Sequence, residues 1–352
     1  MKTITDISKY INKLSKKDKE LFYRIYNFTE DFGTLKIPLE MREWTLKTFG
    51  DVKSVEKQKI IRIDNNVMFE TALFNELRTK RPIDMKTTED VEKIIKEKIG
   101  DPFCKPLTAT PKDSFGRIKG KKCITASNIA KYDAMHGLVI FNEHNPLKFS
   151  LEDIKDYIDT TDKWIKKAHK ENPDRKFPFI TWNCLWKAGA SILHGHIQIL
   201  IAKNKHYQGI ECLRKKSEEY HEKFKSDYFE DLFAIHKSLG LGVKTKNCKI
   251  LVHLTPRKEK EVIIISRELK DVSEQLHSVL KAYKEMGVES FNIGIYLSPI
   301  DKSWKMPVIT RIVDRGNLFE KTADFGGTEV FAATSVIGFD PYKVIEQLKK
   351  EL

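Results

Sequence analysis

The stretch AGASILHGHIQILIA, Ala188 to Ala202, places two histidines and a glutamine directly ahead of a short apolar run. If residues 194–201 form a strand, its two-residue period puts His194, His196 and Gln198 on one face and the isoleucines on the other. A histidine whose second ring nitrogen is held by a carbonyl is a competent nucleophile. A half-buried strand with two hydrogen-bonded histidines is the alternative interpretation, and the spacing alone leaves both open.

Two glycines lie close to these histidines. Gly189 and Gly195 have no Cβ atom, so a ligand or a neighbouring backbone can approach the chain closely at either position. A phosphate attacked by an imidazole requires such an approach. We therefore expect the turn around these glycines to border a ligand site.

The segment resembles the active-site segment of galactose-1-phosphate uridylyltransferase, within the histidine-triad superfamily. The resemblance rests on Asn183, Ala188, Gly189, Ala190, Ser191, His194, His196 and Gln198. In that family the second histidine of HxHxQ becomes nucleotidylated and the glutamine binds the phosphoryl oxygens, so the resemblance implies these roles for His196 and Gln198. It also implies that Asn183 and Ser191 bind substrate. The family usually has proline between the histidines, where this chain has Gly195.

Two further segments resemble the family's substrate-binding segments. RTKRP resembles its RAKRP, whose arginines lie near the nucleotide phosphates, partly across a dimer interface; Arg78 and Arg81 match them. The resemblance thus implies phosphate binding by these arginines and a homodimer. An exposed basic turn is the other interpretation of the segment. Asn128, in Ala126-Ser127-Asn128, matches a strand-edge asparagine near the nucleoside.

A metal site is also implied by the resemblance. The family commonly has a CxxC zinc pair where this chain reads DPFC, so Cys104 matches the second cysteine and Asp101 replaces the first. His144 matches the third ligand and His194 the fourth. Zinc accepts carboxylate oxygen as well as sulfur and imidazole nitrogen. We therefore expect a structural zinc site at these four residues, with separate, unrelated side chains as the alternative.

The order of expected elements predicts an α+β fold with a repeated unit. Residues 1–56 are expected to form a helical N-terminal extension, because apolar residues recur there at helical spacing. Residues 137–203 and 260–315 each show a strand, a helix and two further strands, which favours a duplicated unit with modules at residues 57–210 and 211–352. The resemblance implies two tandem histidine-triad-like modules with antiparallel sheets. The second has Pro307-Val308-Ile309 in place of the histidine pair, so its metal site is expected to be degenerate.

Composition favours an ordinary globular protein of the cytoplasm. The 352 residues are 40% hydrophobic and 32% charged, with neither a membrane-length apolar run nor a signal peptide. Five cysteines without a CxxC pair are expected to be reduced thiols. The net charge of +13 suits a phosphate-rich partner. Because the lysines are spread among acidic residues without a nucleic-acid motif, we do not expect nucleic acid to be the partner.

The leading hypothesis is an enzyme, a nucleotidyltransferase that works through a covalent nucleotidyl-histidine. The resemblance implies hexose-1-phosphate uridylyl transfer, as in galactose metabolism, or phosphorolysis of a nucleotide sugar. The expected partners are a nucleotide sugar and either a sugar phosphate or inorganic phosphate. A dinucleoside polyphosphate phosphorylase and a nucleotide hydrolase are alternatives, although Gln198 stands where the hydrolase branch typically has a third histidine. A non-catalytic nucleotide- or RNA-binding protein is a second alternative, supported by the positive charge.

Overall fold

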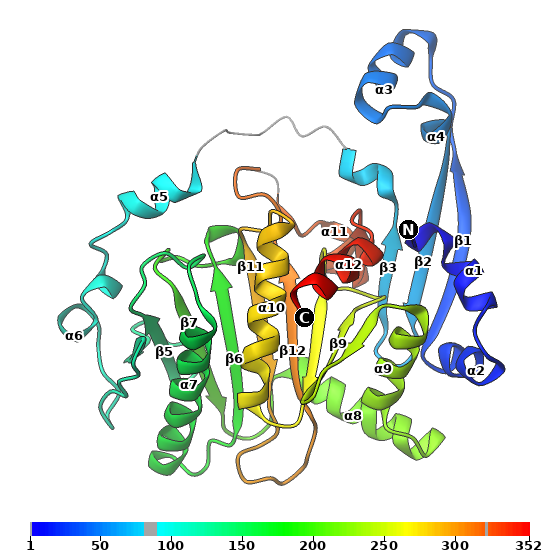
Figure 1. Cartoon of the computed structure of the whole chain (residues 1–352). Coiled ribbons are helices and arrows are strands. Elements are labelled where there is room, and N and C mark those ends of the chain that lie inside the picture. The colour runs from blue at the N-terminus through cyan, green and yellow to red at the C-terminus, as the bar shows by residue number, and fades with distance from the viewer. Residues whose placement is uncertain (1, 81–89, 321–322) are drawn as a thin grey trace.

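The computed structural model describes residues 2–80, 90–320 and 323–352, and its main element is a nine-stranded sheet (Figure 1). All neighbouring strands of this sheet are antiparallel. Their spatial order is β4 (Cys123–Ser127), β5 (His136–Phe141), β7 (His196–Ala202), β6 (Phe177–Cys184), β11 (Phe291–Tyr296), β12 (Val308–Asp314), β10 (Val262–Ser266), β9 (Cys248–Val252) and β8 (Gly242–Lys244). A large antiparallel sheet with helices packed on it confirms the predicted α+β class.

One face of this sheet is covered by α7 (Leu151–Glu171) and α10 (Val272–Glu285), which also contact each other (Figure 1). The first of these helices begins at a capping box. Ser150 Oγ accepts a hydrogen bond from the backbone nitrogen of Asp153 at 3.2 Å, and the Asp153 carboxylate accepts one from the Ser150 nitrogen at 2.8 Å. The Ser-x-x-Asp spacing therefore marks the start of this helix.

The pairing of β6 with β7 shows which residues lie on each face of the large sheet. Trp182 and its partner Ile197 are buried in the main hydrophobic core. Thr181 and its partner Gln198 are one position further along each strand and therefore point to the opposite face. His196 shares that face with Gln198, as predicted. We call the face that carries Thr181, His196 and Gln198 the polar face.

The same order of elements occurs twice in the large sheet. β4, β5, α7, β6 and β7 make the first set, and β9, β10, α10, β11 and β12 make the second. In space the fourth strand of each set lies between the second and the third, and the sets join where β6 pairs with β11. In the second set, the apolar segments EVIIIS, SFNIGIYLS and MPVITRIV contain β10, β11 and β12.

A second, four-stranded sheet has the order β1 (Tyr26–Thr34), β2 (Lys57–Asn65), β3 (Glu70–Phe74) and β13 (Thr334–Ile337), with β13 parallel to β3. The prediction of a helical extension over residues 1–56 is wrong for β1, which pairs with β2 along its whole length. The partner strand begins 23 residues after β1 ends, at Lys57 after Thr34, so spacing within β1 itself does not reveal this pairing. In Figure 1 the two strands rise as a ribbon that carries short helices at its tip.

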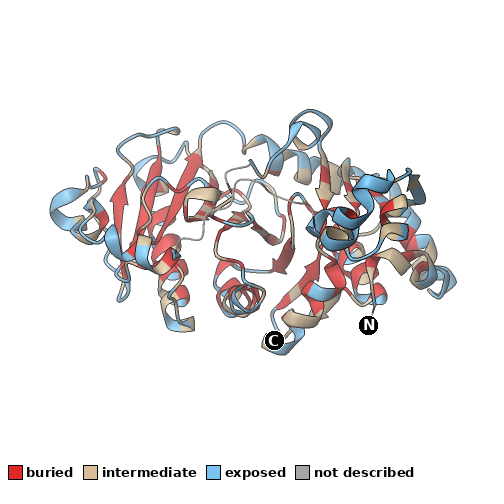
Figure 2. Cartoon of the chain, turned by 90° about the horizontal axis from the view of Figure 1, so that it is seen from above, coloured by how far each residue is buried: buried red, intermediate tan, exposed pale blue. Residues whose placement is uncertain are grey.

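The remaining helices surround the two sheets. They are α1 (Ile7–Asn12), α2 (Lys16–Ile25), α3 (Arg42–Phe49), α4 (Val52–Glu56), α5 (Val91–Glu97), α6 (Pro106–Ala109), α8 (Gln208–Phe224), α9 (Tyr228–Leu239), α11 (Gly327–Ala332) and α12 (Pro341–Glu351). Short 3₁₀ turns span Ile4–Asp6, Leu39–Met41, Glu76–Lys80, Pro102–Cys104, Trp186–Ala188 and Leu269–Asp271. Buried residues concentrate in the strands and on the inner sides of the helices (Figure 2). Within the described ranges, no helix is long and apolar enough to cross a membrane.

A buried group of ion pairs joins the two sheets. Arg311 of β12 donates from Nη1 to Glu70 Oε1 of β3 at 2.8 Å and from Nη2 to Glu261 Oε2 at 3.0 Å. Arg311 is 8% exposed and Glu261 is 1% exposed. Burial by itself raises the pKa of Glu261, but the Arg311 guanidinium and His253 outweigh burial and lower the pKa. The charge on Glu261 is therefore supported by Arg311.

Replacing Arg311 with methionine should lower the free energy of unfolding by about 3–5 kcal/mol, because an unpaired buried carboxylate remains. Urea unfolding measures this change. Arg62→Met is a matched control, since Arg62 pairs with Asp64 at 2.9 Å on the exposed side of β2; it should cost about 0–1 kcal/mol. Equal losses in the two variants would contradict a special role for the buried pairs.

Candidate active site and metal centre

His196 is the first residue of β7 and lies on the polar face. Its Nδ1 atom is 2.9 Å from the carbonyl oxygen of His194, so the ring proton sits on Nδ1 and is donated to that carbonyl. The lone pair is then on Nε2. Burial lowers the pKa of His196, against a smaller opposite effect of the His194 carbonyl. The ring is therefore neutral near neutral pH, which is the form that can attack phosphorus.

Gln198 lies two residues further along β7 on the same face and takes part in a polar group. Its Oε1 atom accepts a short hydrogen bond from Tyr132 Oη and lies 3.0 Å from His136 Nε2. Asn128 joins the group through Nδ2, which lies 3.1 Å from the same His136 nitrogen. Two predicted residues, Gln198 and Asn128, are thus brought together by a histidine between them.

Asn183 is placed next to His196 by the pairing of β6 with β7. Trp182 is paired with Ile197, so Asn183 follows at the level of His196 and on the same face. Its Oδ1 atom accepts a hydrogen bond from Asn292 Nδ2 of β11 at 2.7 Å. Within the described ranges the Asn183 amide nitrogen donates no hydrogen bond, so its hydrogens are open to a ligand. By contrast, Ser191 is exposed in the turn ahead of β7.

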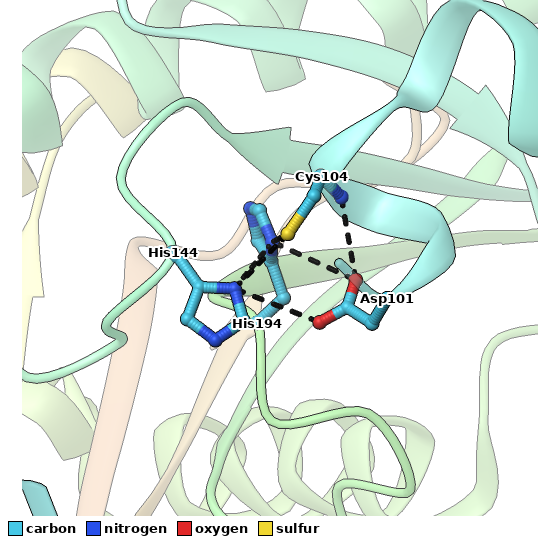
Figure 3. A group of neighbouring side chains, drawn as sticks. All are labelled: Asp101, Cys104, His144 and His194. Atoms are coloured by element: carbon cyan, nitrogen blue, oxygen red, sulfur yellow. Dashed lines mark hydrogen bonds and ion pairs between the residues drawn. The ribbon is translucent and has the colours of Figure 1, made fainter. Parts of the chain in front are cut away.

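The four predicted metal ligands come together at one edge of the large sheet. The ligand atoms of Asp101, Cys104, His144 and His194 all lie within 4.8 Å of one another (Figure 3). Cys104 Sγ is 3.3 Å from His144 Nδ1 and 3.5 Å from His194 Nδ1, and the two nitrogens are 3.1 Å apart. A tetrahedral centre with bonds of about 2.0–2.3 Å has ligand separations of roughly 3.3–3.8 Å. The arrangement therefore has the size of a tetrahedral metal site.

The contacts around these ligands also fit a metal ion. His144 Nε2 lies 2.9 Å from the carbonyl oxygen of Ile95, and His194 Nε2 lies 2.8 Å from that of Phe141. Both ring protons are therefore on Nε2, and the two Nδ1 lone pairs face each other. Asp101 Oδ2 is buried without a hydrogen-bond partner among the described residues and lies 3.6 Å from His144 Nδ1. A cation between these atoms would relieve the repulsion and pair the carboxylate.

Gly195 has a different role from the predicted one. A Cβ at this position would lie 2.3 Å from Cδ2 of Phe141, so the close approach is made by a core side chain rather than by a ligand. The Gly195 nitrogen donates to the carbonyl of His144 at 3.2 Å, and its carbonyl accepts from the Phe141 nitrogen at 3.0 Å. Gly195 therefore holds the turn of His194 against β5. Gly189, with φ of +88°, ends the short turn at Trp186–Ala188.

The two predicted arginines are not both described. Arg81 lies outside the described residues. Arg78 is exposed in the 3₁₀ turn Glu76–Lys80, where its backbone nitrogen donates to the Asn75 carbonyl at 3.1 Å; among the described residues its side chain makes no hydrogen bond or ion pair. It lines a cavity of about 320 Å³ with Lys258 and Arg315, among other residues. No described contact joins Arg78 to His196, so its part in phosphate binding stays a prediction.

Three residues of this region were not expected from the sequence. They are Tyr132, His136 and Asn292. His136 comes two residues before Leu138 in an apolar run, and strand alternation from Leu138 would have placed it on the polar face. Tyr132 is in a loop and Asn292 is in the second half of the sheet, so only the tertiary structure shows that they reach this face.

The fold is shared with solved structures of a GalT-like protein, a phosphorylase and a uridylyltransferase, which confirms the resemblance at the level of fold. An ADP-glucose phosphorylase from Arabidopsis thaliana, solved with bound ADP-glucose, matches with a TM-score of 0.63 and 14% identity over 82% of this chain and 97% of its own. A GalT-like protein from the same plant matches with a TM-score of 0.62 and 15% identity over the same shares. A uridylyltransferase matches with a TM-score of 0.57 and 15% identity, over 83% of this chain and 98% of its own. No protein-family model matches the sequence, and no curated protein matches it.

Proposed function

We propose that the protein is a nucleotidyltransferase that moves a nucleoside monophosphate between two phosphate acceptors through a covalent intermediate on His196. The observation that supports this proposal most directly is the protonation and orientation of the His196 ring. Its Nδ1 donates a hydrogen bond to the His194 carbonyl, and the neutral ring has its lone pair on Nε2. The amide groups of Gln198 and Asn183 on the same face support the binding of phosphoryl oxygens.

The reaction follows from these groups in two steps. His196 Nε2 attacks the α-phosphorus of the donor, and the nitrogen–phosphorus bond forms as the bond to the leaving phosphate oxygen breaks. An oxygen of the incoming phosphate acceptor then attacks the same phosphorus and releases the neutral imidazole. Gln198 and Asn183 would donate hydrogen bonds to the phosphoryl oxygens as their negative charge is redistributed.

For substrates, we propose a nucleotide sugar as donor and a sugar phosphate or inorganic phosphate as acceptor. The known structures that share the fold include an ADP-glucose phosphorylase and a uridylyltransferase, which supports this class. Nothing in the described residues selects galactose. We further propose that residues 57–210 and 211–352 are tandem histidine-triad-like modules, supported by the repeated order of elements, and that the protein forms a homodimer.

For the metal, we propose zinc at Asp101, Cys104, His144 and His194. One sulfur, two imidazole nitrogens and one carboxylate oxygen are a donor set that zinc accepts. Bound there, zinc would supply positive charge that fixes η4 (Pro102–Cys104) and the turn of His194 to one point. Because four protein ligands leave no open position, its role would be structural.

The test of this function is a donor panel read by intact-protein mass spectrometry. The protein is incubated with UDP-glucose, UDP-galactose, ADP-glucose and diadenosine tetraphosphate, each without an acceptor. A mass gain of one nucleoside monophosphate, lost again on adding phosphate or hexose 1-phosphate, is the expected result. Release of free nucleotide to water without an acceptor would favour the hydrolase instead. Salt-sensitive RNA binding with no turnover would favour the non-catalytic protein.

Arg78→Lys tests the predicted binding of phosphate by Arg78. A guanidinium that grips phosphate with two donors is not replaced by lysine, so the KM for the phosphate acceptor should rise by a factor corresponding to about 1.5–3 kcal/mol. Arg42→Lys is the control, because Arg42 is exposed on α3 and pairs with Glu56 at 3.7 Å. An unchanged KM for Arg78→Lys would favour the exposed basic turn.

A further inference from the structure

The side-chain amide of Gln198 is held by its oxygen. Tyr132 Oη makes a short hydrogen bond to Gln198 Oε1, and His136 Nε2 lies 3.0 Å from the same oxygen. Gln198 Nε2 has no hydrogen-bond partner among the described residues. Since it is absent from the buried unpaired atoms, it retains access to solvent. The amide thus has an anchored end and a free donor end on the polar face.

The loop that carries Tyr132 is fixed on both sides of it. This loop joins β4 to β5. Lys131 Nζ donates to the backbone carbonyl of His136 at 2.9 Å, and the Asp133 carboxylate accepts from Arg175 Nη1 at 2.8 Å. Tyr132 is 66% exposed as a residue, yet its ring centroid lies only 4.2 Å from that of His136. The loop therefore directs the hydroxyl of a largely exposed tyrosine inward to Gln198.

His136 alone does not decide which end of the Gln198 amide faces inward. Asn128 Nδ2 lies 3.1 Å from the same His136 nitrogen, so Nε2 either accepts from Asn128 or donates to Gln198, depending on the tautomer. Burial of the Tyr132 hydroxyl raises its pKa, so this group stays protonated and able to donate. In the structure Tyr132 Oη donates to Gln198 Oε1, and with the amide oxygen held there the nitrogen is turned outward.

We propose that Tyr132 is a positioning residue for the transfer reaction, whose hydroxyl fixes the Gln198 amide with Nε2 toward the phosphoryl group. The inference rests on the proposed function, because it assigns that group to the α-phosphate of a nucleotide. Without the tyrosine hydroxyl, the amide rotates more freely and for part of the time presents its oxygen to a negatively charged phosphate. Such an orientation weakens the stabilisation of the transition state.

The experiment is a double-mutant cycle of Tyr132→Phe and Gln198→Ala with two measurements. The first is the rate of adduct formation from UDP-glucose or ADP-glucose, and the second is the affinity for UMP and AMP by calorimetry. Tyr132→Phe should slow adduct formation about tenfold, with little change in KM for the donor, and should cause no further slowing in the Gln198→Ala protein. Ile129→Ala, at an 89% exposed position of the same loop, should leave the rate unchanged.

The outcomes separate this inference from the proposed function. If the adduct forms but the two substitutions act additively, the function stands and the positioning role is overturned. If UMP or AMP binds without any adduct, covalent transfer is overturned, and coupling between the substitutions in the binding affinities still supports the positioning role. If the wild-type protein neither binds these nucleotides nor forms an adduct, both are overturned.

Discussion

The His196→Ala protein is expected to fold and to lose nucleotidyl transfer by at least about 10³-fold, because the attacking atom is gone. Among the described residues, the imidazole makes one hydrogen bond, to the His194 carbonyl, and an edge contact with Phe103 at 5.2 Å between ring centroids. Its removal should therefore cost no more than about 1–3 kcal/mol of stability. The measurement is the mass gain on incubation with the active donor, together with the rate of transfer to the acceptor.

One control variant and one pH profile bear on this prediction. His221→Ala, in an exposed position on α8, should keep both the adduct and the rate. In the wild-type protein, burial lowers the pKa of His196, so the ring stays neutral as the pH falls to the ordinary histidine pKa of 6.5, and adduct formation should decline only below that pH. A His196→Ala protein that still transfers nucleotide, or that still gains the nucleotide mass, would show that another group is the nucleophile.

The second large effect is expected at the metal site. Cys104→Ala should abolish stoichiometric metal binding and lower the free energy of unfolding by about 4 kcal/mol. This is the stabilisation that a bound metal provides when its free concentration is about a thousandfold above its dissociation constant. Without the metal, the facing nitrogens of His144 and His194, 3.1 Å apart, and the buried Asp101 oxygen are left without a shared partner. Elemental analysis of untagged protein and urea unfolding with and without chelator are the measurements.

Turnover should respond less than stability to this change. The His194 carbonyl, which orients His196, belongs to the turn that the metal would fix, so some loss of rate is expected when the metal is removed. Cys212→Ala is the matched control, because Cys212 is an exposed thiol on α8. If wild-type protein prepared without chelator contains no stoichiometric zinc or other divalent metal, the metal proposal fails.

The two halves of the large sheet differ in what their equivalent positions carry. In the first half, the polar face presents Asn128, His136 and Gln198 near His196. In the second half, the equivalent positions carry His253 directly after β9, Glu261 directly before β10 and Arg311 on β12. These three side chains form buried ion pairs. A closed set of ion pairs leaves little to bind a ligand, so we place the chemistry in the first half.

Much of the local structure was determined by the sequence itself. Alternation of polar and apolar residues put His196 and Gln198 on one face of a strand, and Ser150 with Asp153 marked the start of α7. These patterns depend on neighbours within a few residues, which is why they can be read directly. The four candidate metal ligands were identified through a family resemblance and not from spacing, because Cys104 and His194 are far apart in the chain.

Other features were decided by the tertiary structure alone. β1 is a strand because β2 is available to pair with it, although the helical spacing ahead of it continues to Ile25. Gly195 is required by the ring of Phe141 on the adjacent strand, and Tyr132 reaches Gln198 from a loop 66 residues earlier. Each of these depends on contacts between segments distant in sequence, and local propensity contains no information about such partners.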